Sequence, residues 1–183
     1  MSLIKVFVVF HEKFYPDIYD LSEEDKHKYL MFYGVDKQQT SNLNVIYEYG
    51  FEIYNPKWQR LKYNEATALY HIYKNTFYEK YDFIGLFQYD MEVSSECFPD
   101  VEESFKQNPN TIFIIDYFKW HFFGGQSVIV NDFHYFKSGL KTYNELFNTN
   151  YTVTEKLQNH MPSNTTFIIN KLLFKKLMLF LEN

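Results

Sequence analysis

The chain has 183 residues, of which 46% are hydrophobic, which suffices for one domain with a substantial core. Its formal net charge is −5 with no lysine-rich run, so the basic surface that nucleic-acid binding needs is missing and we expect no nucleic-acid partner. The single cysteine, Cys97, excludes an internal disulfide and a multi-cysteine zinc site within this chain.

The first residues, Met1 to Lys5, carry no signal-peptide pattern and run directly into a strand-like stretch. No apolar run approaches the roughly 18 residues that a membrane-spanning helix needs. We therefore expect a cytoplasmic protein without a transmembrane segment.

The first third of the chain alternates between strand and helix patterns. Ile4–Phe10 is a nearly continuous apolar run rich in valine, typical of a buried central strand. Ser22 followed by three acidic residues predicts the start of a helix, and Tyr29–Tyr33 predicts a second strand that Gly34 closes. A polar loop over Asp36–Asn44 and an irregular stretch over Tyr47–Arg60 follow.

A helix over residues 64–75 is the best-defined element, because Ala66, Leu69, Tyr70 and Tyr73 recur with helical spacing. The elements predicted after it are a strand from Phe83, a helix opened by Pro99 and Asp100, a strand over Thr111–Ile115, a strand over Ser127–Val130, a helix from Asn131 that Gly139 ends, a short helix from Thr154 to His160, a strand over Phe167–Ile169 and a helix over Lys171–Leu181. This alternation predicts a single α/β domain, residues 1–183, with a mostly parallel central sheet flanked by helices.

The strand from Phe83 to Phe87 ends in acidic residues, and this is the clearest chemical signal in the sequence. Asp90 and Glu92 are two residues apart, so both side chains face the same way if the chain stays extended. Ligands of open α/β sheets collect at the carboxyl ends of strands, and carboxylate oxygens suit Mg²⁺ or Mn²⁺. The pattern therefore predicts a divalent metal site.

Three segments resemble a family of small GT-A-type glycosyltransferase domains, found in bacterial capsule and lipopolysaccharide synthesis and encoded by large DNA viruses of algae and protists. They are the Glu-x-Thr-Ala-Leu-Tyr helix within Tyr63–Asn75, the strand Gly85–Tyr89, and the late strand and lysine-rich helix over Thr165–Phe174. Many bacterial relatives carry His-Tyr-Arg-Arg after the middle strand, whereas this chain has Gln88-Tyr89-Asp90-Met91-Glu92. Its metal pair is then Asp90 with Glu92, or Gln88 with Asp90.

The resemblance implies a GT-A-like nucleotide-diphospho-sugar transferase fold and assigns roles to further residues. His160 would complete the metal shell or touch the diphosphate. An inverting enzyme also needs a base that takes a proton from the acceptor hydroxyl, and Asp116 is the candidate because it follows the predicted strand Thr111–Ile115. The residues expected to bind the donor are Phe10, His11, Tyr33, Asp36, Asn64, Glu65, Gln88, Gly124 and Gly125. Among these, Phe10, His11 and Tyr33 would form an aromatic wall for the base, with Asp36 near the ribose.

We therefore expect a metal-dependent hexosyltransferase that uses Mn²⁺ or Mg²⁺. Its donor would be a nucleotide sugar, with a UDP-sugar favoured, and its acceptor a hydroxyl of a glycan or glycoprotein. Two alternatives stay open. The first is a sugar nucleotidyltransferase, which would want a glycine-rich phosphate loop where this chain has Phe10-His11-Glu12-Lys13. The second is a non-catalytic domain, derived from a transferase, that binds glycans or partners.

Overall fold

The computed structural model describes residues 3–10, 15–35, 44–55, 65–89, 91–114, 117–119, 138–152, 160–162 and 166–182. The chain forms two compact units. The first unit consists of Met1–Ile115 and Thr165–Met178, and the second of Asp116–Asn164 and Leu179–Asn183. The first unit contains the main sheet and is built as an α/β structure.

Six strands of the described chain form one sheet in the first unit, in the order β3-β2-β1-β4-β8-β5. β3, β2, β1 and β4 are parallel to one another, and β8 pairs antiparallel with both β4 and β5. The strands are β1 Ile4–Phe10, β2 Leu30–Gly34, β3 Val45–Tyr47, β4 Phe83–Gln88, β5 Phe113–Ile114 and β8 Phe167–Asn170. The predicted α/β class with a mostly parallel sheet is thus confirmed.

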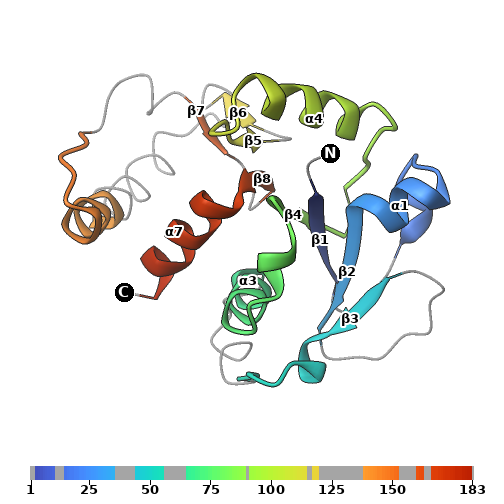
Figure 1. The fold of residues 1–183 in the computed structure, drawn as a ribbon, viewed down its shortest axis with the longest axis horizontal. Coiled ribbons are helices and arrows are strands. Elements are labelled where there is room, and N and C mark those ends of the chain that lie inside the picture. Colours follow the sequence, from blue (N-terminus) through green and yellow to red (C-terminus); the bar gives the residue numbers. More distant parts are fainter. Residues whose placement is uncertain are drawn as a thin grey trace. The chain divides into compact units, whose positions relative to one another are not determined.

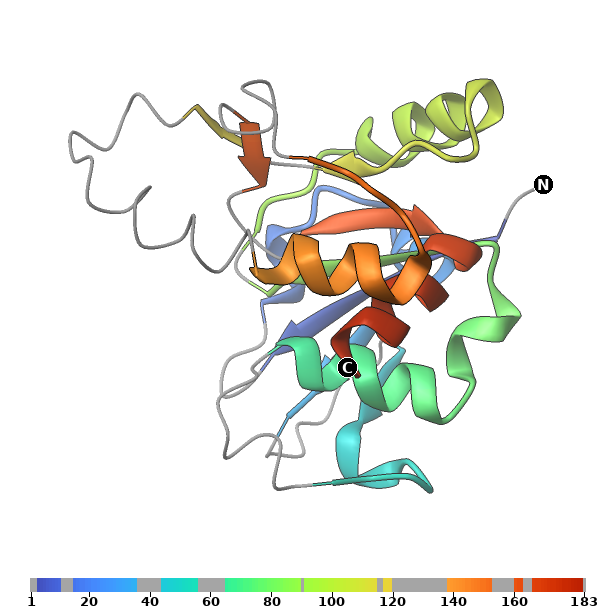
Figure 2. The same ribbon diagram turned by 90° about the vertical axis from the view of Figure 1, so that its left-hand side faces the viewer.

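Helices cover both faces of this sheet (Figures 1 and 2). Residues of α1 and α4 pack on one face, and residues of α3, the 3-10 helix η3 and α7 pack on the other. In Figure 2 the strands run between α4 above and α3 below. The bounds are α1 Glu23–Tyr29, α3 Glu65–Lys74, η3 Phe77–Lys80, α4 Cys97–Gln107 and α7 Lys171–Leu181.

β1 occupies the centre of the sheet, and all seven of its residues are buried. Its side chains alternate between the two faces, as those of a strand must. Val6, Val8 and Phe10 pack with the residues of α1 and α4, whereas Phe7 and Val9 pack with those of α3 and α7. A strand buried on both faces needs an unbroken apolar run, which is why this segment was recognisable from sequence.

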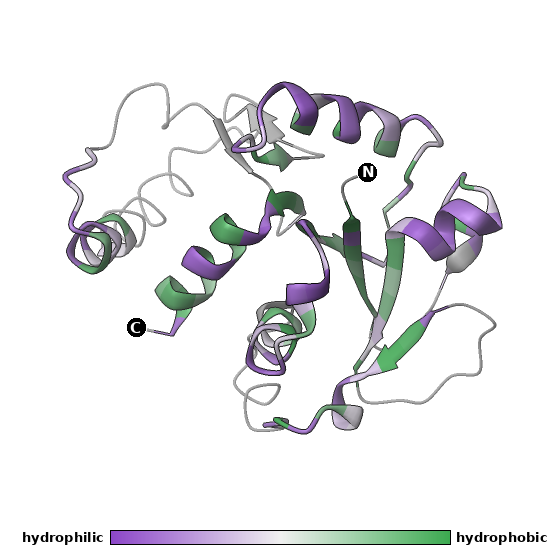
Figure 3. Ribbon diagram, in the orientation of Figure 1, coloured by the Kyte–Doolittle hydropathy of each residue, from purple (hydrophilic) through white to green (hydrophobic). Residues whose placement is uncertain are grey.

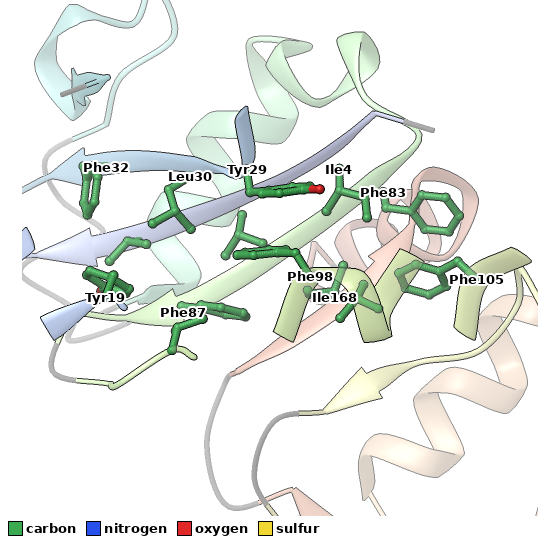
Figure 4. Close-up of a cluster of buried hydrophobic side chains, with 14 of the residues drawn as sticks. Ile4, Tyr19, Tyr29, Leu30, Phe32, Phe83, Phe87, Phe98, Phe105 and Ile168 are labelled. Atoms are coloured by element: carbon green, nitrogen blue, oxygen red, sulfur yellow. The ribbon is translucent and has the colours of Figure 1, made fainter. Parts of the chain in front are cut away.

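Aromatic stacking holds α4 against both α1 and the sheet. The rings of Tyr29 and Phe98 lie parallel with centroids 4.2 Å apart, and Phe83 stacks on Phe105 at 3.9 Å. Figure 4 shows these rings within one cluster, with Tyr19, Phe32 and Phe87 at the end toward which the strands run. The outward side of α4 is hydrophilic, as Figure 3 shows. α4 is therefore an amphipathic helix of the kind that covers a sheet.

Several predicted boundaries are confirmed. Ser22 caps α1, because its hydroxyl oxygen accepts a hydrogen bond from the Asp25 backbone N–H at 3.1 Å. β1 and α7 begin and end at the predicted residues. α3 is one residue shorter than predicted at each end, and β8 is one residue longer at its end. β5 is shorter than the predicted strand, and α4 begins two residues before Pro99.

Two predictions in the second unit are wrong. Gly139 does not end a helix, because residues 138–147 are helical. Asn148 follows that helix with a φ of 50°, so asparagine provides the left-handed end that was assigned to glycine. The predicted strand over Ser127–Val130 and the start of the predicted helix at Asn131 lie outside the described residues.

His160 is not the end of a helix either. His160–Pro162 forms strand β7, which pairs antiparallel with β6, Tyr117–Lys119. No helix within the described parts of the chain is long and apolar enough to cross a membrane.

We predict that Gly85→Ala destabilises the first unit. Gly85 lies in β4 between Val6 of β1 and Ile168 of β8. A Cβ atom there would lie 2.8 Å from Val6 Cγ2, 2.9 Å from Ile168 Cγ1 and 3.0 Å from the Phe167 carbonyl oxygen. Because the last of these is backbone, relief would require strand separation, and overpacking of this kind costs about 1–3 kcal/mol.

Gly50→Ala is the matched control, since no atom lies within 4 Å of its added Cβ. Its free energy of unfolding, measured by urea denaturation, should stay within about 0.5 kcal/mol of the parent. Equal losses for the two variants would contradict the close approach at Gly85.

Candidate functional site

The order of the strands marks one place in the sheet where a ligand would bind. From β1 the chain passes to β2 and β3 on one side, and it then returns through α3 to β4 on the other side. β1 and β4 are neighbours, so the connections leave their carboxyl ends in opposite directions. Such a switch point is where open α/β sheets bind ligands. Here it lies between Phe10 and Gln88, the last residues of the two strands.

The segments that follow β1 and β4 are joined to each other beside this point. Tyr19 forms an isolated parallel bridge with Val93, and the Asp20 backbone N–H donates to the Val93 carbonyl oxygen at 3.0 Å. The Tyr19 hydroxyl donates to the Gln88 carbonyl oxygen at 3.4 Å, and its ring is buried in the core. Tyr19 and Asp20 are therefore joined to Gln88 and Val93, although about 70 positions separate them in the chain.

An open pocket of about 450 Å³ lies between these two segments. This volume is within the range that small-molecule sites occupy. Glu92 contributes a carboxylate from the segment after β4, and Asp20 contributes another from the segment after β1. Both side chains are exposed. The remaining lining residues are Ile18, Val93, Ser94 and Cys97.

Asp20 was not singled out by the sequence analysis, because nothing in its local pattern connects it with Glu92. Only the bridge between Tyr19 and Val93 brings the two acids to one pocket. Cys97 is no candidate nucleophile there: burial, with a smaller contribution from the Asp100 charge, raises the pKa of its thiol to about 11.

Asp90 lies outside the described residues, but both of its neighbours in the chain make defined contacts. The Tyr89 ring stacks on Tyr15 with centroids 6.2 Å apart and an interplanar angle of 21°. The buried Thr166 hydroxyl donates to the Met91 sulfur at 3.1 Å. Tyr89 thus packs on the segment after β1, and Met91 is bonded to the residue that precedes β8.

Tyr15 and Tyr89 form an aromatic pair beside the pocket segments, and the sequence analysis did not select them. Tyr15 is 41% exposed, whereas Tyr89 is half-buried. Their stacking joins the segment after β1 to the segment after β4. The position of Tyr89 directly after a predicted strand could have marked it as a site residue. The chain has 17 tyrosines, however, so this position alone did not distinguish Tyr89 before its stacking partner was known.

Phe10 and Tyr33, predicted to form an aromatic wall for a base, are both fully buried. Phe10 packs in the core with α1 and α4, and Tyr33 packs in the core with α3. Neither ring offers a surface to a ligand in this structure, and their role within it is packing. Gln88 is half-buried and is the last residue of β4.

Tyr33 also belongs to a buried polar network centred on His71 of α3. The His71 Nε2 accepts a hydrogen bond from the Asn55 backbone N–H at 3.2 Å. Nε2 is therefore unprotonated, so in the neutral ring Nδ1 carries the proton and donates to the Tyr33 hydroxyl oxygen at 2.8 Å. Burial lowers the pKa of His71 to about 4. The neutral imidazole thus ties β2 and the segment of Asn55 to α3.

The other predicted site residues are not brought together by the described structure. His160 has a defined backbone in the second unit, in β7, and Glu65 has one at the start of α3 in the first. His11, Asp36, Asn64, Asp116, Gly124 and Gly125 lie outside the described residues. Within the described part of the chain, no three histidine, cysteine, aspartate or glutamate side chains are close enough to share a metal ion.

Comparisons with known proteins leave the family open. No protein-family model, no curated protein and no solved structure matches this chain.

We predict that the free energy of unfolding falls as the pH drops from about 6.5 toward 4. His71 is neutral when folded, with a pKa of about 4, and it gains a proton when unfolded below its ordinary pKa of 6.5. Its contribution is therefore fully present above pH 6.5 and is lost as the pH approaches 4, by at most about 3 kcal/mol.

His71→Gln removes the titration while keeping a hydrogen-bonding side chain. Urea denaturation of both proteins at several pH values isolates this residue, because the other five histidines are present in both. The parent should lose more stability than the variant between pH 6.5 and 4. Parallel pH profiles would show that His71 is not held neutral.

Proposed function

We propose that this protein is a metal-dependent glycosyltransferase that moves a hexose from a nucleotide sugar, most simply a UDP-sugar, to a hydroxyl of a glycan or glycoprotein. One observation carries the proposal: the acidic segment after β4 lies at the switch point of a doubly covered α/β sheet. There it meets a second acid in a pocket of suitable volume. The resemblance of the α3, β4 and β8–α7 segments to GT-A-type domains gives the reaction class.

The donor atoms at this pocket fit a hard divalent cation. Glu92 and Asp20 both place exposed carboxylates at its wall, and Mg²⁺ and Mn²⁺ prefer such oxygen ligands. Asp90 precedes Glu92 by two residues in the same segment. When bound, the ion would supply positive charge to the diphosphate that leaves with the nucleotide.

The protein's own contribution would be positioning. Tyr19 bonds to the end of β4 and pairs with Val93, the neighbour of Glu92, which supports a positioning role for this part of the chain. Tyr15 offers an exposed ring for stacking with a planar base or a sugar face. Asp116 as the acceptor base, His160 as a late ligand and the cytoplasmic location remain predictions.

We predict that UDP binding requires Mn²⁺ or Mg²⁺ and depends on Asp90 and Glu92. Calorimetric titration should show Mn²⁺-dependent binding of UDP to the parent. Asp90→Asn and Glu92→Gln should each weaken that binding about tenfold or more, because each removes a charged ligand. Glu92 is exposed and makes no core contact, so its loss should leave folding intact.

Glu96→Gln provides a matched control. Glu96 is an exposed acid that follows Glu92 closely in the chain, but its side chain does not line the pocket. It should bind UDP and Mn²⁺ like the parent. Equal binding by the parent, Asp90→Asn and Glu92→Gln would overturn the metal site. UDP binding without hydrolysis or transfer in a nucleotide-sugar screen would favour the non-catalytic alternative.

A further inference from the structure

Segment 51–55 is attached to α3 through side chains of the helix and of the residue that follows it. The Asn75 side chain accepts a hydrogen bond from the Ile53 backbone N–H at 2.9 Å and donates one to the Ile53 carbonyl oxygen at 2.9 Å. One turn earlier, His71 Nε2 accepts from the Asn55 backbone N–H at 3.2 Å. These five described residues belong to no helix or strand. We refer to segment 51–55 as the latch.

The latch covers the His71 ring. Its Phe51 ring lies 6.3 Å from the His71 ring and its Tyr54 ring lies 5.3 Å from it, both measured between centroids. The second ring nitrogen, Nδ1, bonds to the Tyr33 hydroxyl of β2 at 2.8 Å. His71 is fully buried in this arrangement. Release of the latch would therefore expose the imidazole to water.

A proton on His71 Nε2 is incompatible with the closed latch. A backbone N–H can only donate, so the bond from Asn55 requires a lone pair on Nε2. Protonation would turn Nε2 into a second donor that faces the Asn55 N–H. The bond is then lost, and this conflict follows from the hydrogen-bond geometry alone.

The titratable groups of β2 and η2 do not stabilise a protonated ring. Burial raises the pKa of the Tyr33 hydroxyl, so this group stays neutral. η2 contributes Glu48, a buried carboxylate that accepts a hydrogen bond from the Tyr54 hydroxyl at 3.2 Å. An acid that stabilised the imidazolium would raise the pKa of His71, whereas burial lowers that pKa to about 4.

The charged residues of the latch and of α3 near His71 are Glu52 and Lys74. Glu52 has an exposed side chain. The Lys74 ammonium lies over tyrosine rings of its own helix, 5.1 Å from the centroid of the Tyr70 ring. The balance at His71 therefore favours the neutral ring while the latch is closed.

We propose that segment 51–55 is a proton-dependent latch, which is closed on neutral His71 and is released from its Asn55 end when the ring takes up a proton. The bonds between Asn75 and Ile53 involve no titratable group, so the latch would pivot at Ile53 as Asn55 leaves. This conformational change does not depend on the proposed transfer reaction.

Proton linkage sets the size of the effect. The pKa of His71 is about 4 with the latch closed and would return toward its ordinary value of 6.5 with the latch open. Between these values the open state binds more protons than the closed state, so it gains population as the pH falls. The equilibrium constant for opening should rise about 20-fold between pH 7 and pH 5.

Amide hydrogen exchange of the full chain at these two pH values, read by NMR, tests the proposal. The protection factor of the Asn55 amide, corrected for the intrinsic exchange rate, should fall about 20-fold. The Ile53 and Leu173 amides are held by asparagine side chains, which do not titrate, so their protection factors should change by less than about threefold. Equal falls at all three amides, or none at Asn55, would overturn the proposal.

His71→Gln is the matched variant. The glutamine oxygen can accept from the Asn55 N–H but takes up no proton in this range, so the protection factor of Asn55 should become independent of pH to within about threefold. A fall as large as that of the parent would assign the opening to another group. If the variant does not fold, nitrogen NMR shifts of the parent's imidazole decide: the latch requires a proton on Nδ1 at pH 7, and a proton on Nε2 would exclude it.

Discussion

The burial of β1 on both faces is the constraint on which the rest of the first unit depends. β1 pairs with β2 on one side and with β4 on the other, and its seven residues have almost no access to solvent. A strand in this position needs helices on both faces, and α1 with α4 and α3 with α7 supply them. The close packing extends to Gly85, where β1, β4 and β8 approach too closely for any side chain.

The same constraint creates the candidate site. Because β1 is central, the chain leaves it toward β2 and must return to the other side for β4, so two segments emerge at neighbouring carboxyl ends. Tyr19 then joins those segments by inserting its ring into the core and its hydroxyl toward the end of β4. The pocket with Asp20 and Glu92 follows from this arrangement.

The sequence alone predicted a helix or strand correctly where its local residue pattern and its burial agree. The apolar run of β1 and the Ser22 cap of α1 each determine an element without help from distant residues. The helix end predicted at Gly139 was wrong, because glycine is frequent at helix ends but is also tolerated inside a helix. The antiparallel direction of β8 could not be predicted, since strand direction depends on how the chain returns to the sheet.

The candidate site was predictable only in part, because some of its residues show a local pattern and others depend on distant segments of the chain. An acidic segment after a buried strand is a local signal, and the segment of Gln88 and Glu92 does lie at the switch point. The contributions of Asp20 and Tyr15 depend on bridges and stacking between segments about 70 residues apart, which no local pattern encodes. Conversely, Phe10 and Tyr33 were assigned to a base by the resemblance, and both rings are buried in the core.

Line broadening by Mn²⁺ in the amide NMR spectrum, recorded with UDP present, tests the central claim most directly. A metal bound at the carboxyl ends of β1 and β4 should remove the signals of Asp20, Gln88 and Glu92 first. Phe83, at the other end of β4 and about 17 Å from Gln88 along the strand, should keep its signal. Broadening centred on Phe83 and Ile4, or no selective broadening at all, would contradict a donor and metal site at this edge of the sheet.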